Sequence, residues 1–215
     1  MIISPGRGYV FVHIPKTGGT SLALALESRA MKDDILIGDT PKAKRRKGRL
    51  KGVQTSGRLW KHSTLADIDG LLAEGELEQL FAFTLVRNPW DRVVSYYHWL
   101  RVQSFDHAAV ALAKELTFED FVCHPATLAS LRHTPAARYM TRADGTEQCT
   151  ACIRIEHLEE DAAPLWAHLG FRLGLPRENA SDRAPDFRQY HSDRSAAAVS
   201  EACAVDIARF GYGFG

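Results

Sequence analysis

The sequence predicts an α/β fold in which a central parallel sheet is flanked by helices. Two continuous apolar runs, Tyr9–Ile14 and Leu80–Val86, are typical of strands that are buried on both faces. Each run passes through a short polar loop into a segment with helical periodicity, and a third strand is predicted over Cys152–Glu156. Strands that alternate with helices in this order favour a parallel sheet covered by helical layers.

Length and composition are those of an ordinary globular protein. The chain has 215 residues, 45% of them hydrophobic and 25% charged, which indicates a single domain over 1–215 with a substantial core. The net charge is +1, but residues 1–61 hold 13 Lys and Arg against 4 Asp and Glu, a net of +9. An anionic ligand is therefore expected at the N-terminal third, whereas the balanced total gives no general attraction to nucleic acid.

The stretch His13–Ser21 has the composition of a phosphate-binding loop. It follows the first strand and leads into a helix predicted over Thr20–Met31. Gly18 and Gly19 allow several backbone N–H groups to point at one spot, and the helix N-terminus adds partial positive charge there. A full charge comes from Lys16, and hydroxyl donors come from Thr17, Thr20 and Ser21.

This loop has an alternative interpretation as a plain strand-to-helix turn, in which the glycines only permit the backbone path. The lysine and the hydroxyls in the same nine residues favour a phosphate site. In the ordinary P-loop the lysine follows the last glycine, and a Ser or Thr then binds magnesium. Here Lys16 precedes both glycines, so the order disfavours a site for ATP with magnesium.

The next charged feature is residues 42–51, in which seven of ten residues are basic. Repulsion between like charges predicts an exposed, mobile surface loop over about 41–52. The charge serves either solvation alone or the guidance of an anionic acceptor such as an acidic polysaccharide. A nucleic-acid surface is disfavoured, because no series of aromatic residues for base stacking accompanies the charge.

A histidine follows just ahead of the next predicted helix. Ser63 or Thr64 can cap that helix, and its apolar positions are Leu65, Ile68, Leu71 and Leu72. His62 therefore lies near a helix start, where a lone histidine is usually structural or solvated. A catalytic role for it is the alternative.

The second strand ends at Arg87, where open α/β sheets bind ligands. Asn88 is predicted to cap a helix over 89–102, with Asp91 favourably placed in its first turn. The guanidinium of Arg87 fits a phosphate, and Ser95, about two turns along, can add a hydroxyl. The alternative is that Arg87 forms an ion pair with Asp91.

Short helices are predicted for most of the remaining chain. They cover Ala108–Glu115, Phe118–Cys123, Leu128–Tyr139, Leu158–Leu169 and Ser195–Phe210, with an irregular polar segment over 175–183. The helical excursion over about 104–146 lies between strands, where such segments commonly form the wall of an acceptor cleft.

The cysteine pattern and the apolar runs bear on the compartment. Cys149 and Cys152 form a lone C-x-x-C. A zinc site requires a second pair of ligands, and a redox motif is expected at the start of a helix that follows a strand. Free thiols are therefore expected. No secretory signal and no apolar run of the roughly 18 residues needed to span a membrane are visible, so a cytoplasmic protein is predicted.

Four separated stretches resemble a known enzyme family. His13-Ile-Pro-Lys-Thr-Gly-Gly-Thr-Ser21 is similar to the 5′-phosphosulfate loop of sulfotransferases that use 3′-phosphoadenosine 5′-phosphosulfate (PAPS). Arg87-Asn-Pro-Trp-Asp-Arg-Val-Val-Ser95, roughly 65 residues further on, resembles their 3′-phosphate motif. Arg154–Asp161 and Asp206–Phe214 resemble later landmarks of the carbohydrate branch, which holds heparan 2-O- and chondroitin sulfotransferases and many bacterial relatives. Within that branch the chain looks like the short, soluble bacterial form.

The resemblance implies a three-layer P-loop fold related to the nucleotide kinases, with a co-substrate site made from both motifs. The 5′-sulfophosphate of PAPS would lie on Pro15, Lys16, Thr17, Gly18, Gly19, Thr20 and Ser21. The 3′-phosphate would be held by Arg87 and Ser95, with a late nucleotide contact from Arg183. The product would be 3′,5′-ADP (PAP), and the mechanism requires no metal.

The resemblance also implies catalytic roles. An acceptor hydroxyl attacks sulfur in line, and Lys16 stabilises the charge that grows on the leaving group. Members of this branch place a histidine between the two phosphate motifs, which makes His62 the predicted base. His13 is its rival, although its place on a buried strand favours a structural role, and His98 and His107 are weaker candidates.

The implied partner is a carbohydrate or glycoconjugate acceptor, with its charge left open. Neither nucleic acid nor a transmembrane segment is expected, while peripheral contact with a membrane stays open. The basic stretch 42–51 lies outside the family pattern, so the acceptor does not carry over from the heparan or chondroitin enzymes. Two other functions compete: an ATP-dependent small-molecule kinase on the same fold, and a non-catalytic module that binds an anionic glycan.

Overall fold

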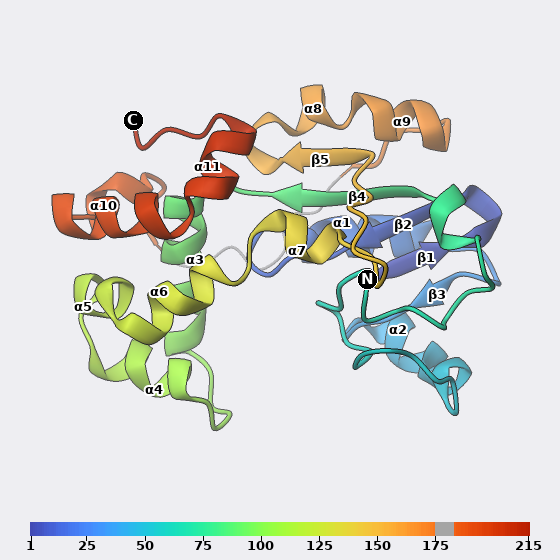
Figure 1. Ribbon diagram of the computed structural model, residues 1–215, viewed down its shortest axis with the longest axis horizontal. Helices are drawn as coiled ribbons and strands as arrows, with labels where there is room; N and C mark the ends of the chain where they lie inside the picture. The colour runs from blue at the N-terminus through green and yellow to red at the C-terminus, as the bar shows by residue number, and fades with distance from the viewer. Residues whose placement is uncertain (175–182) are drawn as a thin grey trace. The chain divides into compact units, whose positions relative to one another are not determined.

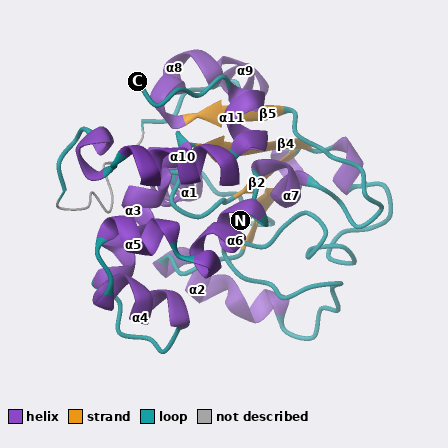
Figure 2. Cartoon of the chain, turned by 60° about the vertical axis from the view of Figure 1, so that its left-hand side comes forward, coloured by secondary structure: helices purple, strands orange, loops and turns teal. Residues whose placement is uncertain are grey.

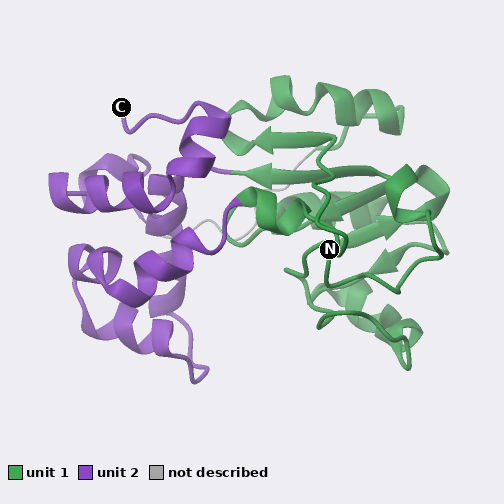
Figure 3. Ribbon diagram, viewed as in Figure 1, with its two compact units in different colours: residues 1–86, 136–178 green, residues 87–135, 179–215 purple. Residues whose placement is uncertain are grey.

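A computed structural model describes residues 1–174 and 183–215 of the chain and contains two compact units (Figure 3). Unit 1 comprises residues 1–86 and 136–178, and unit 2 comprises residues 87–135 and 179–215. The segment predicted to be irregular, 175–183, lies outside the described residues except for Arg183.

Unit 1 contains a five-stranded, mostly parallel sheet (Figure 1). Its strands are β1 (Ile2–Ser4), β2 (Tyr9–Val12), β3 (Ile35–Leu36), β4 (Phe81–Val86) and β5 (Ala151–Arg154), in the order β3-β1-β2-β4-β5. The three predicted strands pair in parallel, with Val12 opposite Thr84 and Val86 opposite Arg154. β1 was not predicted; it runs antiparallel to both of its neighbours, so the sheet is not purely parallel.

Helices and short 3-10 turns flank the sheet of unit 1. The helices are α1 (Gly19–Ser28), α2 (Pro41–Arg46), α7 (Ala136–Met140), α8 (Leu158–Asp161) and α9 (Ala163–Leu169), and the 3-10 turns are η1 (Pro5–Arg7), η2 (Lys47–Leu50), η3 (Leu77–Gln79) and η4 (Ile155–His157). On one face, Phe11 and Phe83 lie with ring centres 5.3 Å apart in a buried cluster with Leu22 of α1 and Leu165 of α9. The α/β fold with helices flanking the sheet is therefore confirmed.

The regular secondary structure in the described residues of unit 2 consists of helices, which are joined by loops (Figure 2). It holds α3 (Pro89–Arg101), α4 (Ala108–Glu115), α5 (Phe118–Cys123), α6 (Pro125–Arg132), η5 (Phe187–Tyr190), α10 (Asp193–Ala202) and α11 (Ala204–Phe210). The helix predicted over Leu128–Tyr139 is interrupted, because the chain leaves α6 ahead of Pro135 and restarts as α7. Within the described parts of the chain, every helix is too short or too polar to span a bilayer.

The segment after His62 folds as turns, so the helix predicted to start at Ser63 or Thr64 is wrong. The Asp67 N–H donates to the Thr64 hydroxyl at 3.1 Å, as in a helix cap, but the next backbone bonds go elsewhere. Leu65 N–H donates to the carbonyl of Tyr139 at 2.9 Å, and Ala66 N–H donates to that of Thr141 at 3.1 Å. The bonds that follow span three residues, from Asp69 N–H to Ala66 at 3.3 Å and from Leu71 N–H to Ile68 at 2.9 Å, so they form turns and not an α-helix.

The basic segment is also more regular than predicted, since α2 and η2 occupy most of the expected loop over 41–52. Thr40 caps α2 by accepting the N–H of Ala43, and Pro41 occupies the first helical turn. Lys42 and Arg46 donate to carbonyl oxygens at the end of α1 and just beyond it. Carbonyls at a helix C-terminus lack intrahelical partners and attract cations, so these contacts offset the repulsion within the segment.

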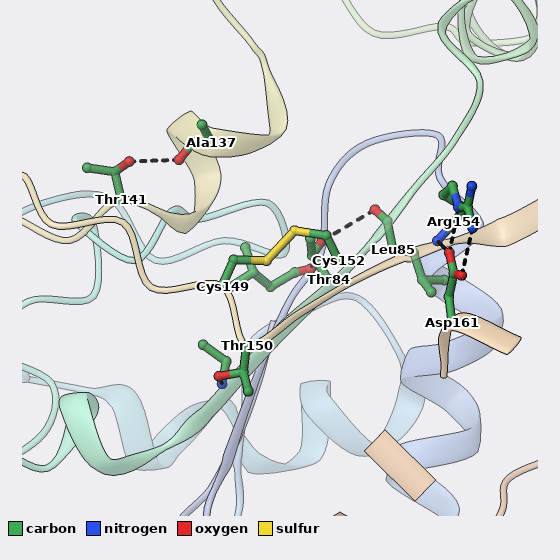
Figure 4. Close-up of a disulfide and its surroundings, with 11 residues drawn as sticks. Thr84, Leu85, Ala137, Thr141, Cys149, Thr150, Cys152, Arg154 and Asp161 are labelled. Carbon is green, nitrogen blue, oxygen red and sulfur yellow. Dashed lines mark hydrogen bonds and ion pairs between the residues drawn. A yellow bond between two sulfur atoms is a disulfide. The ribbon is translucent and has the colours of Figure 1, made fainter. Parts of the chain in front are cut away.

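Cys149 and Cys152 form a disulfide, so the prediction of free thiols is wrong for this pair (Figure 4). The chain turns just before β5, where the Thr150 N–H donates to the carbonyl of Ala82 at 2.7 Å. The turn brings the Cα atoms of the two cysteines to 6.4 Å, within the range that a disulfide spans. Cys123 and Cys203 are free, as predicted.

An ion pair ties the end of β5 to α8 (Figure 4). The Asp161 carboxylate accepts from Nε of Arg154 at 2.7 Å, from Nη2 at 2.9 Å and from its backbone N–H at 3.0 Å. These hydrogen bonds hold the pKa of Asp161 below its usual range. Arg154 is followed at once by Ile155, whose side chain packs beside Gly18, so the pair also supports the candidate loop.

We expect Asp161→Asn to lower the free energy of unfolding by about 2 kcal/mol at pH 7, since it weakens charge-assisted hydrogen bonds. Because the folded pKa is depressed, this stabilisation is present above the unfolded pKa and is lost as pH falls through the folded one. Urea unfolding between pH 2.5 and 7 measures the difference. Glu160→Gln, at an exposed position of the same helix, is the control, and an equal loss in both variants would contradict the prediction.

Candidate active site

The loop between β2 and α1 has the backbone of an anion-binding turn. Lys16 and Gly18 have positive φ angles of 66° and 82°, and Lys16 is the one non-glycine residue with positive φ among residues 1–174 and 183–215. Left-handed residues in a short loop turn successive N–H groups toward a common concavity. The strained backbone at Lys16 is therefore a feature typical of a binding site.

Thr17 differs from its neighbours in how it uses its hydroxyl. Its side chain is buried, and Oγ1 donates to the carbonyl oxygen of Ile14 at 2.9 Å, which tightens the loop. Thr17 can therefore offer an anion its backbone N–H, while its hydroxyl proton is already used. Thr20 and Ser21 lie half-buried on the first turn of α1, and Pro15 and Lys16 are half-buried in the loop.

The two glycines are required by close neighbours rather than by the turn alone. A Cβ on Gly19 would lie 2.2 Å from Cδ2 of His13, and one on Gly18 would lie 2.2 Å from Cδ1 of Ile155. Gly18 also ends the loop as the left-handed N-cap of α1. The imidazole of His13 therefore fills the space beside the first residue of α1.

His13 is placed as a structural residue. It is 6% exposed, and burial, followed by the nearby charges of His62, Lys61 and Lys16, holds its pKa well below the usual value. Its ring centre lies 4.6 Å from that of His62, with the planes at 68°. The structure thus brings Lys16, His13 and His62 into one electrostatic neighbourhood of unit 1.

His62 has the geometry and the protonation state of a proton acceptor. Its Nδ1 lies 2.7 Å from the carbonyl oxygen of His13, and a carbonyl only accepts, so Nδ1 carries the proton. Burial lowers the pKa of His62 to about 4. The charge of Lys61 also lowers it, whereas the hydrogen bond to His13 raises it. The neutral ring at pH 7 therefore keeps the lone pair of Nε2 available as a base.

Unit 2 holds the other predicted site residues, Arg87, Ser95 and Arg183. Asp91 receives both arginines: Nη2 of Arg87 lies 2.6 Å from its Oδ2, and Nη2 of Arg183 lies 2.5 Å from its Oδ1. All three side chains are at most 18% exposed. Together they carry one positive charge in a largely dry environment, which suits an anion.

The local fold around these residues follows the prediction. Asn88 caps α3 by accepting the N–H of Trp90 at 3.1 Å, and Pro89 opens the helix. Ser95 is buried on α3. The ion pair between Arg87 and Asp91, which the sequence left as the alternative, exists and is shared with Arg183.

The weaker histidine candidates also lie in unit 2. His107 caps α4, because its Nδ1 accepts the N–H of Ala109 at 3.1 Å. His98 packs edge-on against Tyr190 at 5.1 Å, and burial, with Arg183 and Arg101, lowers its pKa. Among the described residues, no three His, Cys, Asp or Glu side chains gather closely enough to hold a metal ion.

Two contributions escaped the sequence reasoning. Arg183 and Asp91 are 92 residues apart, and no local pattern links them. Trp60 packs edge-on against His62 with ring centres 5.0 Å apart. The sequence signal for this contact was that Trp60 stands two residues before His62.

Fold and site together define an α/β protein with a strand–loop–helix turn of the phosphate-binding type. The model of the sulfotransferase family matches residues 1–203, and the chain belongs to that family. The resemblance is thus confirmed at the level of the family, while the carbohydrate branch and the bacterial form stay predictions. No relative was found among the curated proteins. Among solved structures, mouse sulfotransferase SULT7A1 complexed with PAP is similar at 15% identity and a TM-score of 0.46, over 94% of this chain and 88% of that chain.

We expect Gly19→Ala to destabilise unit 1 by about 1–3 kcal/mol, because the buried His13 ring cannot yield to a Cβ at 2.2 Å without moving the loop. Gly48→Ala is the matched control, since a Cβ there meets nothing within 4 Å. Urea denaturation compares the two variants. A Gly19→Ala protein as stable as Gly48→Ala would show that His13 does not hold the loop.

Proposed function

We propose that the chain transfers a sulfuryl group from PAPS to a hydroxyl of a carbohydrate or glycoconjugate by in-line displacement. The main support is the loop that contains Lys16 and Gly18, because both residues have a left-handed backbone and the chain belongs to the sulfotransferase family. The arginine pair on Asp91 supports a second phosphate, and PAPS carries phosphate at both the 5′ and the 3′ position.

Under this proposal each candidate residue has a distinct role in binding or in the transfer step. The loop N–H groups and Lys16 bind the 5′-sulfophosphate, and Lys16 stabilises the charge that develops on the bridging oxygen. Arg87 and Arg183 bind the 3′-phosphate, with Ser95 adding a hydroxyl. His62 accepts the acceptor's proton at Nε2. The oxygen–sulfur bond to the acceptor forms as the bond from sulfur to the bridging oxygen breaks, and PAP leaves.

The basic segment supports an acceptor that is itself anionic. Lys42, Arg46 and Arg49 are bound to carbonyl oxygens of the chain. The exposed basic side chains of the segment are Lys44, Arg45, Lys47, Arg49 and Lys51. These charges would draw an acidic glycan toward unit 1.

The two competing functions are separable. A kinase would need magnesium and would bind ATP better than PAP, whereas the lysine-first loop favours a different phosphate ligand. A glycan-binding module would bind without turnover and would not need Lys16.

Incubation with labelled PAPS and a panel of polysaccharides, oligosaccharides, glycolipids and phenols tests the proposal. Lys16→Ala should lower the rate of sulfate transfer at least about 100-fold and leave the melting temperature unchanged. Lys114→Ala, the control, should leave the rate of transfer at the wild-type level.

We expect Arg87→Ala to weaken PAP binding by about 1.5–3 kcal/mol and to leave 5′-AMP binding almost unchanged, because only PAP carries a 3′-phosphate. Isothermal titration calorimetry with both nucleotides measures the two affinities. Arg132→Ala, which removes an exposed arginine paired with Glu201 in the same unit, serves as the control. Equal losses for PAP and 5′-AMP would remove Arg87 from the 3′-phosphate site.

We expect the imidazole of His62 to titrate near pH 4 in the free protein and at higher pH with PAP bound, because bound phosphate offsets the positive charges of Lys61 and the N-terminus. NMR titration of the histidine rings measures both values, and His62→Gln assigns the signal. The depressed pKa also means that unfolding becomes easier as pH falls from 6.5 toward 4, since the unfolded state binds the proton first. Titration near 6.5 without ligand would contradict the assignment.

A further inference from the structure

Trp60 is an exposed aromatic side chain beside the candidate base. It is 45% exposed, whereas Trp90 and Trp166 are buried. A single exposed apolar side chain is ordinary on a protein surface. What distinguishes Trp60 is its contact with His62, since the two ring centres lie 5.0 Å apart with the planes at 85°.

The turn that carries both rings is held in place by a buried serine. Ser63 is fully buried, and its Oγ accepts the N–H of Trp60 at 2.9 Å. The same hydroxyl lies 2.9 Å from the carbonyl oxygens of Arg58 and Trp60. The Ser63 N–H closes the turn onto the Trp60 carbonyl at 3.0 Å. The backbone that carries the indole is therefore held in place before any ligand arrives, which lowers the entropy cost of ordering this turn on binding.

The surroundings of Trp60 are polar and positively charged. Arg58 is exposed in the same turn, and Lys61 forms an ion pair with Asp39 at 2.7 Å while staying 37% exposed. An exposed indole beside a neutral imidazole matches a sugar ring, which has C–H groups on its face and hydroxyls at its rim. The partly positive C–H groups meet the negative face of the indole.

We propose that Trp60 is the acceptor platform, on which the face of a pyranose ring stacks so that one hydroxyl reaches Nε2 of His62. This inference rests on the proposed function and names the acceptor's recognition element. Trp60 supplies neither proton nor electrons to the transfer. Its contribution is therefore to the binding and orientation of the acceptor, and it should affect the acceptor's KM more than the chemistry.

The test compares wild type with Trp60→Ala, Trp60→Phe and Phe105→Ala. Phe105 is 47% exposed, so its truncation is a matched loss of exposed aromatic surface. The acceptor probes are a chondroitin hexasaccharide, cellohexaose and 2-naphthol. Trp60→Ala should raise the hexasaccharide KM about tenfold, leave the PAPS KM within about twofold and keep PAP binding, while Trp60→Phe lies between. Phe105→Ala should match wild type.

A second readout does not depend on turnover. Titration with each hexasaccharide should change the intrinsic fluorescence of wild type and of Phe105→Ala, and Trp60→Phe should abolish that change. This arm decides the matter if Trp60→Ala proves unstable.

The outcomes separate the two proposals. If wild type transfers sulfate and Trp60→Ala keeps the acceptor KM within twofold, the platform is overturned and the proposed function stands. If wild type accepts only 2-naphthol, the pyranose assignment is overturned. If no acceptor is sulfated and PAP does not bind, the proposed function fails. If the fluorescence change is absent in wild type, or persists in full in Trp60→Phe, the platform is overturned as well.

Discussion

The carbonyl oxygen of His13 accepts the Nδ1–H of His62 at 2.7 Å, and the candidate site of unit 1 depends on this contact. The hydrogen bond selects the tautomer of His62 and so decides which nitrogen can accept a proton. The ring of the same His13 occupies the space beside Gly19, where α1 begins. One buried residue at the end of β2 therefore positions both the candidate base and the first turn of the anion-binding loop.

Features encoded by neighbouring residues could be predicted from the sequence. The apolar run that forms β4, the caps of α3 and the loop from His13 to Ser21 are each contained in a short window, so their physics is local. The mostly parallel sheet followed from the alternation of strands with helices. From the residues alone, the partner of Arg87 could be either a phosphate or Asp91. The family motifs favoured the phosphate.

Features that depend on distant partners could not be predicted. β1 exists because Ile2 and Ile3 pair with both β2 and β3, and the chain after His62 is tied to residues 139 and 141 by the N–H groups of residues 65 and 66. The basic segment is ordered by carbonyl oxygens at the end of α1, which no charge count reveals. Arg183 reaches Asp91 across 92 positions, so their shared ion pair becomes visible only in three dimensions.

The protonation of His62 makes two demands that conflict in the free protein. Burial and the charge of Lys61 keep its pKa at about 4, which leaves the ring neutral and ready to accept a proton. A base of that strength is nevertheless weak at neutral pH, because general-base catalysis is most efficient when the pKa lies near the working pH. Under the proposed function the substrate resolves the conflict, since sulfate and phosphate at the Lys16 loop add negative charge that opposes the effect of Lys61 and the N-terminus on His62. That charge favours the imidazolium formed as the acceptor's proton leaves, so the base gains strength only when the sulfuryl donor is in place.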